Sequence, residues 1–108
     1  MNESTLNILN IRSVIVQLLP AGHPSLKLVA AQLDISPRTL QRRLAENGFT
    51  HSQLVHQARL TIACQRLAQE GVNISEIASD TGFASPSAFC RAFQSWTGTT
   101  PRVFRKGL

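Results

Sequence analysis

The sequence predicts an all-α protein of about seven helices, arranged as two helix-turn-helix lobes joined by a long linker helix. Apolar residues recur at spacings of three and four along most of the chain, and no alternating strand pattern interrupts them. One stretch also occurs twice, because Ser36–Leu44 and Ser85–Phe93 share a Ser, a Pro, two apolar residues and an Arg at matching offsets. A helix that begins Ser-Pro after a short helix and a turn is typical of a helix-turn-helix.

The first two helices are predicted from apolar spacing and from the signals at their ends. Residues 5–19 place five apolar side chains at helical spacing: Ile8, Ile11, Ile15, Leu18 and Leu19. Pro20-Ala21-Gly22 ends this helix. Ser25 can cap a second helix that runs to about Leu33, because a serine hydroxyl accepts a hydrogen bond from an N–H of the first turn.

The third helix is the first copy of the repeat. Asp34 precedes it and is a plausible turn residue, because aspartate tolerates a positive φ better than most side chains. Ser36 can cap this helix, and Pro37 takes its first position, where a missing N–H costs nothing. Asn47-Gly48 is a good signal for its end.

The longest uninterrupted helical stretch covers residues 51–69 and is predicted to be the linker helix. Its apolar surface is wide: Leu54, Val55, Leu60, Ile62, Ala63, Cys64 and Leu67. A wide stripe is expected when a helix packs against partners on more than one side. Its length is about 28 Å, against about 34 Å for one turn of B-DNA. Two flanking lobes could therefore be set about one DNA turn apart.

The second lobe repeats the first with one extra residue at its turn. Thr81-Gly82 is predicted as this turn, since glycine accepts a positive φ freely. Ser85-Pro86 begins a sixth helix whose predicted buried face has helical spacing: Phe89, Ala92, Phe93 and Trp96. Pro101 starts a short last helix that runs through about Lys106.

The charge distribution favours a polyanionic partner. The chain carries 11 Lys and Arg against 6 Asp and Glu, a formal net charge of +5. No acidic residue follows Asp80, whereas four basic residues do. A basic skew of this kind is typical of nucleic-acid-binding domains, although a basic surface without a specific partner has the same composition.

The sequence gives little support for catalysis, a metal, a cofactor or a membrane. It contains no carboxylate pair, activated nucleophile or glycine-rich phosphate loop, so we do not expect an enzyme. Cys64 and Cys90 lack metal-ligand spacing and are interpreted as small apolar residues in a reduced cytoplasm. No apolar run approaches the ~20 residues of a membrane span, and Met1–Ser4 do not begin a secretory signal. We therefore expect a cytoplasmic protein.

Two other functions remain open at this level. A helical module could bind another protein, such as a polymerase, with its basic charge incidental. A strong salt dependence of duplex binding would argue against that module, because neutralising phosphates releases counterions. An architectural protein could bind DNA without regard to sequence, but the Arg and Gln pattern of Ser36–Leu44 counts against it.

The second copy and its flanks resemble a known family. The run Ile77-Ala78-x-x-Thr81-Gly82-Phe83-Ala84-Ser85-x-Ser87-x-Phe89-x-Arg91-x-Phe93, followed by Gly98-x-x-Pro101, is similar to the signature of the arabinose-regulator (AraC/XylS) transcription regulators. The resemblance covers about residues 9–106. It implies a seven-helix bacterial DNA-binding domain whose third and sixth helices enter successive major grooves on one face of the duplex.

By position, the resemblance also implies base-reading residues on both of these helices. They are Arg38, Gln41 and Arg42 in the first lobe, and Ser87, Ala88, Cys90 and Arg91 in the second. Arginine can contact the O6 and N7 atoms of guanine together, and glutamine can contact N6 and N7 of adenine. Because the first lobe offers three long donors and the second only Arg91, we expect the first lobe to carry most of the sequence discrimination.

Phosphate contacts are expected from basic side chains and from the N–H groups at the two helix starts. The candidates are Ser36, Arg43, Ser85, Arg102, Arg105 and Lys106. Three other basic residues are interpreted as ordinary solvated charges: Arg12, Lys27 and Arg66. Arg59 can be either a solvated charge or a tie between the linker helix and its neighbours.

The sequence thus predicts one DNA-binding domain over residues 1–108, with lobe one at about 5–48, the linker helix at about 51–69 and lobe two at about 74–106. The expected partner is double-stranded DNA at promoter sites, and the resemblance adds RNA polymerase and activation. Family members are commonly longer, with a separate effector or dimerisation domain for which this chain has no room. We therefore expect a fragment of a longer regulator, in which a small-molecule effector acts only through a domain absent from this chain.

Overall fold

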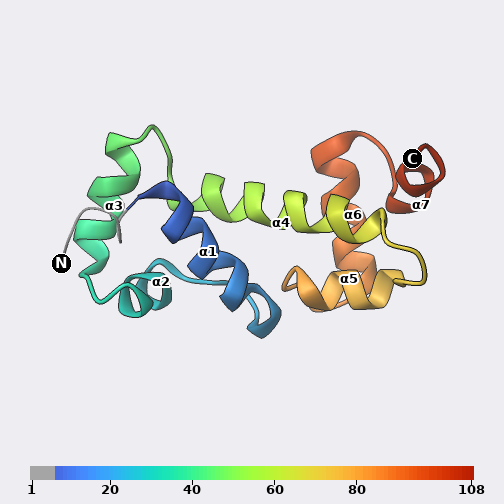
Figure 1. Ribbon diagram of the computed structural model, residues 1–108. Coiled ribbons are helices and arrows are strands. Elements are labelled where there is room, and N and C mark those ends of the chain that lie inside the picture. Colours follow the sequence, from blue (N-terminus) through green and yellow to red (C-terminus); the bar gives the residue numbers. More distant parts are fainter. Residues whose placement is uncertain (1–6) are drawn as a thin grey trace.

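The computed structural model describes residues 7–108 and is all-α over that range (Figure 1). Within it the elements are α1 (Ile8–Leu18), the 3₁₀ helix η2 (Leu19–Ala21), α2 (Leu26–Gln32), α3 (Pro37–Glu46), α4 (His51–Leu67), α5 (Ile74–Asp80), α6 (Pro86–Thr97) and α7 (Pro101–Lys106). The predicted fold class and its seven helices are confirmed. The predicted start of the first helix and of lobe one, at Thr5, lies outside the described residues.

Each α-helix follows a polar residue whose side chain accepts a hydrogen bond from the backbone N–H three positions on. These caps are Asn7, Ser25, Ser36, Thr50, Asn73, Ser85 and Thr100. The predicted caps Ser25, Ser36 and Ser85 are confirmed, with O···N distances of 3.1, 3.0 and 3.1 Å. A proline opens α3, α6 and α7, where no intrahelical hydrogen bond is lost.

The two helix-turn-helix turns have the same backbone conformation at equivalent positions. Asp34 has φ 58° and Gly82 has φ 83°. In each turn the next residue donates its N–H to an alanine carbonyl five positions back, at 3.0 and 2.9 Å. Both turns therefore close the preceding helix in the same way, and the sequence repeat reflects a structural repeat.

Two separate hydrophobic cores form, and α4 contributes to both. The first core unites α1, η2, α2, α3 and the first half of α4 through Ile11, Ile15, Leu19, Val29, Ala30, Leu40, Leu44, Leu54, Val55 and Ala58. The second core unites the second half of α4 with α5 and α6 through Ala63, Leu67, Ile77, Ala78, Phe89 and Phe93. The wide apolar surface predicted for the linker helix is thus two narrower stripes, one for each core.

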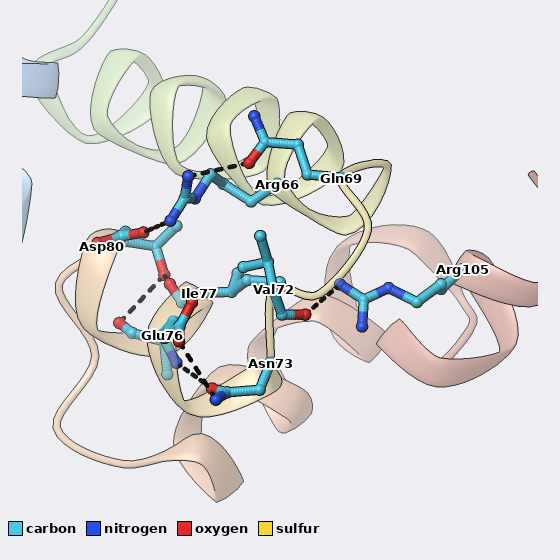
Figure 2. A network of polar contacts seen from close by, with 10 residues as sticks. Arg66, Gln69, Val72, Asn73, Glu76, Ile77, Asp80 and Arg105 are labelled. Atoms are coloured by element: carbon cyan, nitrogen blue, oxygen red, sulfur yellow. Dashed lines mark hydrogen bonds and ion pairs between the residues drawn. The ribbon is translucent and has the colours of Figure 1, made fainter.

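Two arginines hold the second lobe to the end of α4 (Figure 2). Arg66 on α4 pairs with Asp80 on α5 at 2.8 Å. Arg105 on α7 donates through Nε to the Leu67 carbonyl at 2.9 Å and through Nη2 to the Val72 carbonyl at 2.7 Å. The expectation that Arg66 is a solvated charge is therefore wrong, because tertiary packing places a carboxylate beside it.

Two further details differ from the prediction. The predicted buried face of α6 is confirmed at Phe89 and Phe93, whereas Ala92 and Trp96 are only half-buried. Trp96 lies at the edge of the second core, where its ring meets that of His56 on α4 at a centroid distance of 4.8 Å. Residues 68 and 69 are not part of α4, which ends at Leu67.

No single helix within residues 7–108 is long and apolar enough to cross a membrane. The segments Ile8–Ala21 and Leu26–Gln32 meet the criteria of length and composition only as a pair, which is bent by 120°.

His51, the first residue of α4, is half-buried against the first lobe. Its Nε2 lies 2.7 Å from the carbonyl oxygen of Pro24, and its ring meets that of His23 edge-on at 6.3 Å. Since a carbonyl oxygen only accepts, Nε2 carries the proton and the buried Nδ1 does not. Burial lowers the pKa of His51 below 6.5; the bond to Pro24 opposes this change and the charge of His23 adds to it.

We predict that the free energy of unfolding decreases as the pH falls below about 6.5, because the unfolded chain then binds a proton that the folded chain binds less readily. His51→Gln keeps a neutral N–H donor for Pro24 and is expected to remove this part of the pH dependence. Urea unfolding of both proteins at about pH 7.5 and about pH 5.5 measures the difference. The same loss of stability in both proteins would contradict this account of His51.

Candidate nucleic-acid interface

Two helices present equivalent exposed faces. The helices α3 and α6 stand at opposite ends of α4 and run in the same general direction (Figure 1). Each is the second helix of its helix-turn-helix unit, and each turns a pair of residues four positions apart into its own core: Leu40 and Leu44 in α3, Phe89 and Phe93 in α6. Within residues 7–108, the opposite faces of α3 and α6 carry the exposed residues of these helices.

The exposed face of α3 is basic and polar. The three predicted base-reading residues Arg38, Gln41 and Arg42 are all exposed, and they lie together along one groove. They share a side of the helix because Leu40 and Leu44 occupy the other. The structure thus brings these three long donors together on one surface.

An acidic residue, Glu46, lies in the last turn of α3 beside two arginines. Its carboxylate oxygens are 3.8 Å from Nε of Arg42 and 3.7 Å from Nη1 of the half-buried Arg43. The side chains of Arg42 and Glu46 remain 65% and 52% exposed, so this pair opens at little cost. Sequence reasoning missed Glu46, although its spacing of four from Arg42 and three from Arg43 was a usable signal.

The exposed face of α6 offers fewer donors. Ser87 and Arg91 are exposed, whereas Ala88 and Cys90 are half-buried. Cys90 packs against the second core, so little of its side chain is left for a partner. Arg91 occupies the position in α6 that Arg42 occupies in α3 and is the one long charged donor among these four residues.

The residues predicted to contact phosphates are not equally available. Arg102 and Lys106 are exposed on α7. Arg105 is half-buried, and its Nε and Nη2 are already bound to backbone carbonyl oxygens (Figure 2). The hydroxyl groups of Ser36 and Ser85 cap their own helices by accepting the backbone N–H groups of Thr39 and Ala88.

Residues 7–108 contain two free thiols and no cluster of potential metal ligands. No group of three or more His, Cys, Asp or Glu residues there is placed to hold a metal ion. Cys64 and Cys90 are free and half-buried. Burial raises the pKa of the Cys64 thiol, which disfavours its reactive thiolate form.

Comparisons of sequence agree with this geometry. Residues 29–107 match the sequence model of a family described as a helix-turn-helix domain. The HTH-type transcriptional regulator VirS of Mycobacterium tuberculosis is 44% identical over 89 residues, which are 82% of this chain and 26% of VirS. The chain therefore spans about a quarter of the length of this curated relative.

Solved structures share the same arrangement of helices. The transcriptional regulator CdpR of Pseudomonas aeruginosa has a TM-score of 0.72 and 34% identity, covering 94% of this chain and 33% of CdpR. The DNA-binding domain of the global transcriptional factor AdpA, crystallised in complex with a target DNA, has a TM-score of 0.74 and 24% identity. That likeness covers 93% of this chain and 90% of the AdpA domain, and at this identity it concerns the fold alone.

We predict that Glu46→Gln raises the affinity for duplex DNA of arbitrary sequence by about two- to fivefold, because two arginines lose their intramolecular partner and one repulsive charge disappears. Glu70→Gln is the matched control, since it removes the same charge from an exposed loop. Fluorescence anisotropy at low salt compares the two variants. An equal gain for both would show that only net charge matters.

Proposed function

Since this chain belongs to the AraC-type family of helix-turn-helix domains, the DNA-binding parts of transcription regulators, we propose that it reads double-stranded DNA through α3 and α6 in successive major grooves. The family binds DNA and is not enzymatic. One observation carries the proposal: Arg42 and Arg91 occupy the same position on the exposed faces of two equivalent helices at opposite ends of α4. If these faces only contacted solvent, an arginine would not be needed at the same position of both helices.

The dimensions of the molecule support simultaneous reading of two grooves. The linker helix α4 has 17 residues, which gives it a length of about 26 Å. With a lobe at each end, the longest extent of the molecule is 44 Å. One turn of B-DNA advances about 34 Å, so the two ends can reach consecutive major grooves on one face of the duplex.

Base reading is assigned mainly to α3. Arg38 and Arg42 would each contact guanine O6 and N7, and Gln41 would contact adenine N6 and N7. In α6, Arg91 is the matching long donor. The remaining predicted residues of α6 offer only short or apolar contacts: Ser87, Ala88 and Cys90. Discrimination is therefore expected to be stronger in the half-site bound by α3.

Phosphate contacts are assigned first to Arg102 and Lys106, because both side chains are exposed on α7. Further candidate donors at the starts of the two helices are the backbone N–H groups of Arg38 and Ser87, because Pro37 and Pro86 carry no N–H and Ser36 and Ser85 already accept those of Thr39 and Ala88. Arg43 and Arg105 are expected to make weaker phosphate contacts, because Arg43 already lies beside Glu46 and Arg105 already binds two backbone carbonyl oxygens. They are supporting contacts that position the protein without reading sequence.

For the whole protein we propose regulation at promoter sites in the cytoplasm, with activation through contact with RNA polymerase. The regulator relatives support the regulatory role. The contact with RNA polymerase and the cytoplasmic location rest on the family resemblance alone. The proposed organisation is a single DNA-binding domain over residues 1–108, with an effector response residing in a separate domain. The separate cores at the two ends of α4 support the division into two lobes.

A selection of bound duplexes from a random library, at near-physiological salt, tests the proposal. We expect a bipartite, non-palindromic motif whose halves lie about one helical turn apart. Salt-dependent binding without enrichment would favour an architectural, sequence-blind protein. No duplex binding at all would overturn the proposal and favour a module that binds another protein.

We predict that Gln41→Ala broadens the base preference in one half-site, at a cost of about 1–3 kcal/mol toward the preferred base. Arg91→Ala is expected to weaken binding with a smaller change in preference, because its neighbours on α6 contribute little discrimination. Repeating the selection with both variants measures the two effects. If Arg91→Ala broadened the motif while Gln41→Ala left it intact, the assignment of the two lobes would be reversed.

A further inference from the structure

The two lobes touch each other directly, in addition to sharing α4. The turn after α5 lies against η2, which belongs to the first core (Figure 1). At this contact a Cβ atom on Gly82 would stand 2.6 Å from the carbonyl oxygen of Leu19 and 3.1 Å from that of Gly22. Only glycine permits such an approach of the two backbones. The other glycines with positive φ have no neighbour within 4 Å of the same point: Gly22, Gly48, Gly71 and Gly98.

An arginine on α4 also contacts this turn. The guanidinium carbon of Arg59 lies 4.9 Å from the ring centroid of Phe83, the residue after Gly82. Its Nε is buried and has no hydrogen-bond partner, so the aromatic face holds this group in place. Burial also lowers the pKa of Arg59. The sequence left two roles open for Arg59, a solvated charge or a tie between the linker helix and its neighbours. The structure supports the second role, because Arg59 joins α4 to Phe83.

A third contact lies one turn earlier on α4. The ring of His56 meets that of Trp96 at the end of α6, at 4.8 Å, and Trp96 in turn meets Phe83 at 5.8 Å. Beside these contacts is a cavity lined by residues of both lobes, including His23, Val55 and Trp96. The space between the lobes is therefore not filled by a continuous core.

We propose that this brace, formed by Gly82 on η2, Arg59 on Phe83 and His56 on Trp96, fixes α6 relative to α3 and thereby sets the half-site spacing that the chain accepts. The inference rests on the proposed function. One added base pair moves the second half-site by about 3.4 Å and turns it by about 35°. A braced molecule cannot follow that change, whereas a molecule hinged only at α4 can follow part of it. Gly82 and Arg59 are thus positioning residues that act on DNA through α6.

Two variants weaken the brace, and each has a matched control. Gly82→Ala introduces the clash with η2, while Gly71→Ala imposes the same strain of positive φ with nothing nearby. Arg59→Ala removes the cation from the Phe83 ring, and Arg59→Lys restores a cation. Thermal unfolding of all four variants identifies any that fail to fold. If Gly82→Ala fails to fold, Arg59→Ala still tests the proposal.

The decisive measurement is the Kd for duplexes that carry the selected half-sites at the preferred spacing and with one base pair added or removed. We expect the wild-type chain to lose about tenfold or more at either altered spacing, as if one bidentate base contact were lost. Gly82→Ala and Arg59→Ala are expected to bind the preferred duplex more weakly and to discriminate less between the spacings. Gly71→Ala and Arg59→Lys should keep the wild-type profile.

A loss of affinity by the same factor at every spacing would overturn the proposal, because the brace would then affect stability alone. Residual dipolar couplings of the free proteins test the mechanical part without DNA. One alignment tensor should fit both lobes of the wild-type chain and the two controls, but not those of the weakened variants. One shared tensor in every variant would also overturn the proposal, while failure of the wild-type chain to select any sequence would instead refute the proposed function.

Discussion

The structure depends on a single constraint, which is that α4 belongs to two hydrophobic cores at once. Its first half buries Leu54, Val55 and Ala58 with the first lobe, and its second half buries Ala63 and Leu67 with the second. A hydrogen-bonded helix is stiff over this length, so each core fixes one end of the same rod. Each helix-turn-helix unit is therefore anchored to the same helix, and the contacts of Gly82, Arg59 and His56 limit the remaining bending between the two halves of α4.

The same packing decides which side chains are offered to a partner. In α3 and α6 the buried pairs lie four residues apart, so the exposed residues fall on one side of each helix. Arg42 in α3 and Arg91 in α6 therefore occupy equivalent exposed positions in the two lobes. Polar ties complete the second lobe, because Arg66 and Arg105 join α5 and α7 to the end of α4. The exposed donors are therefore held by elements that are themselves anchored.

Local signals in the sequence predicted most of the fold. Ser36-Pro37 and Ser85-Pro86 define helix starts through the chemistry of their own first turns, and Asp34 and Gly82 define turns through their tolerance of positive φ. Apart from the local contacts of Glu46 with Arg42 and Arg43, what escaped prediction depends on segments that are separated in the sequence. The Arg66–Asp80 pair, the carbonyl partners of Arg105 and the approach of Gly82 to η2 exist only after the lobes have packed. The spacing of apolar residues along the sequence does not predict such contacts.

We propose that one chain contacts two successive major grooves through α3 and α6, with the separation of these helices set by the fold. Hydroxyl-radical footprinting of the wild-type chain on a selected duplex tests this most directly, because it maps protected sugars on both strands. The account predicts two protected patches on one face of the duplex, about 10 base pairs apart, bound by a single molecule. One patch only, or two patches that appear at different protein concentrations, would contradict it.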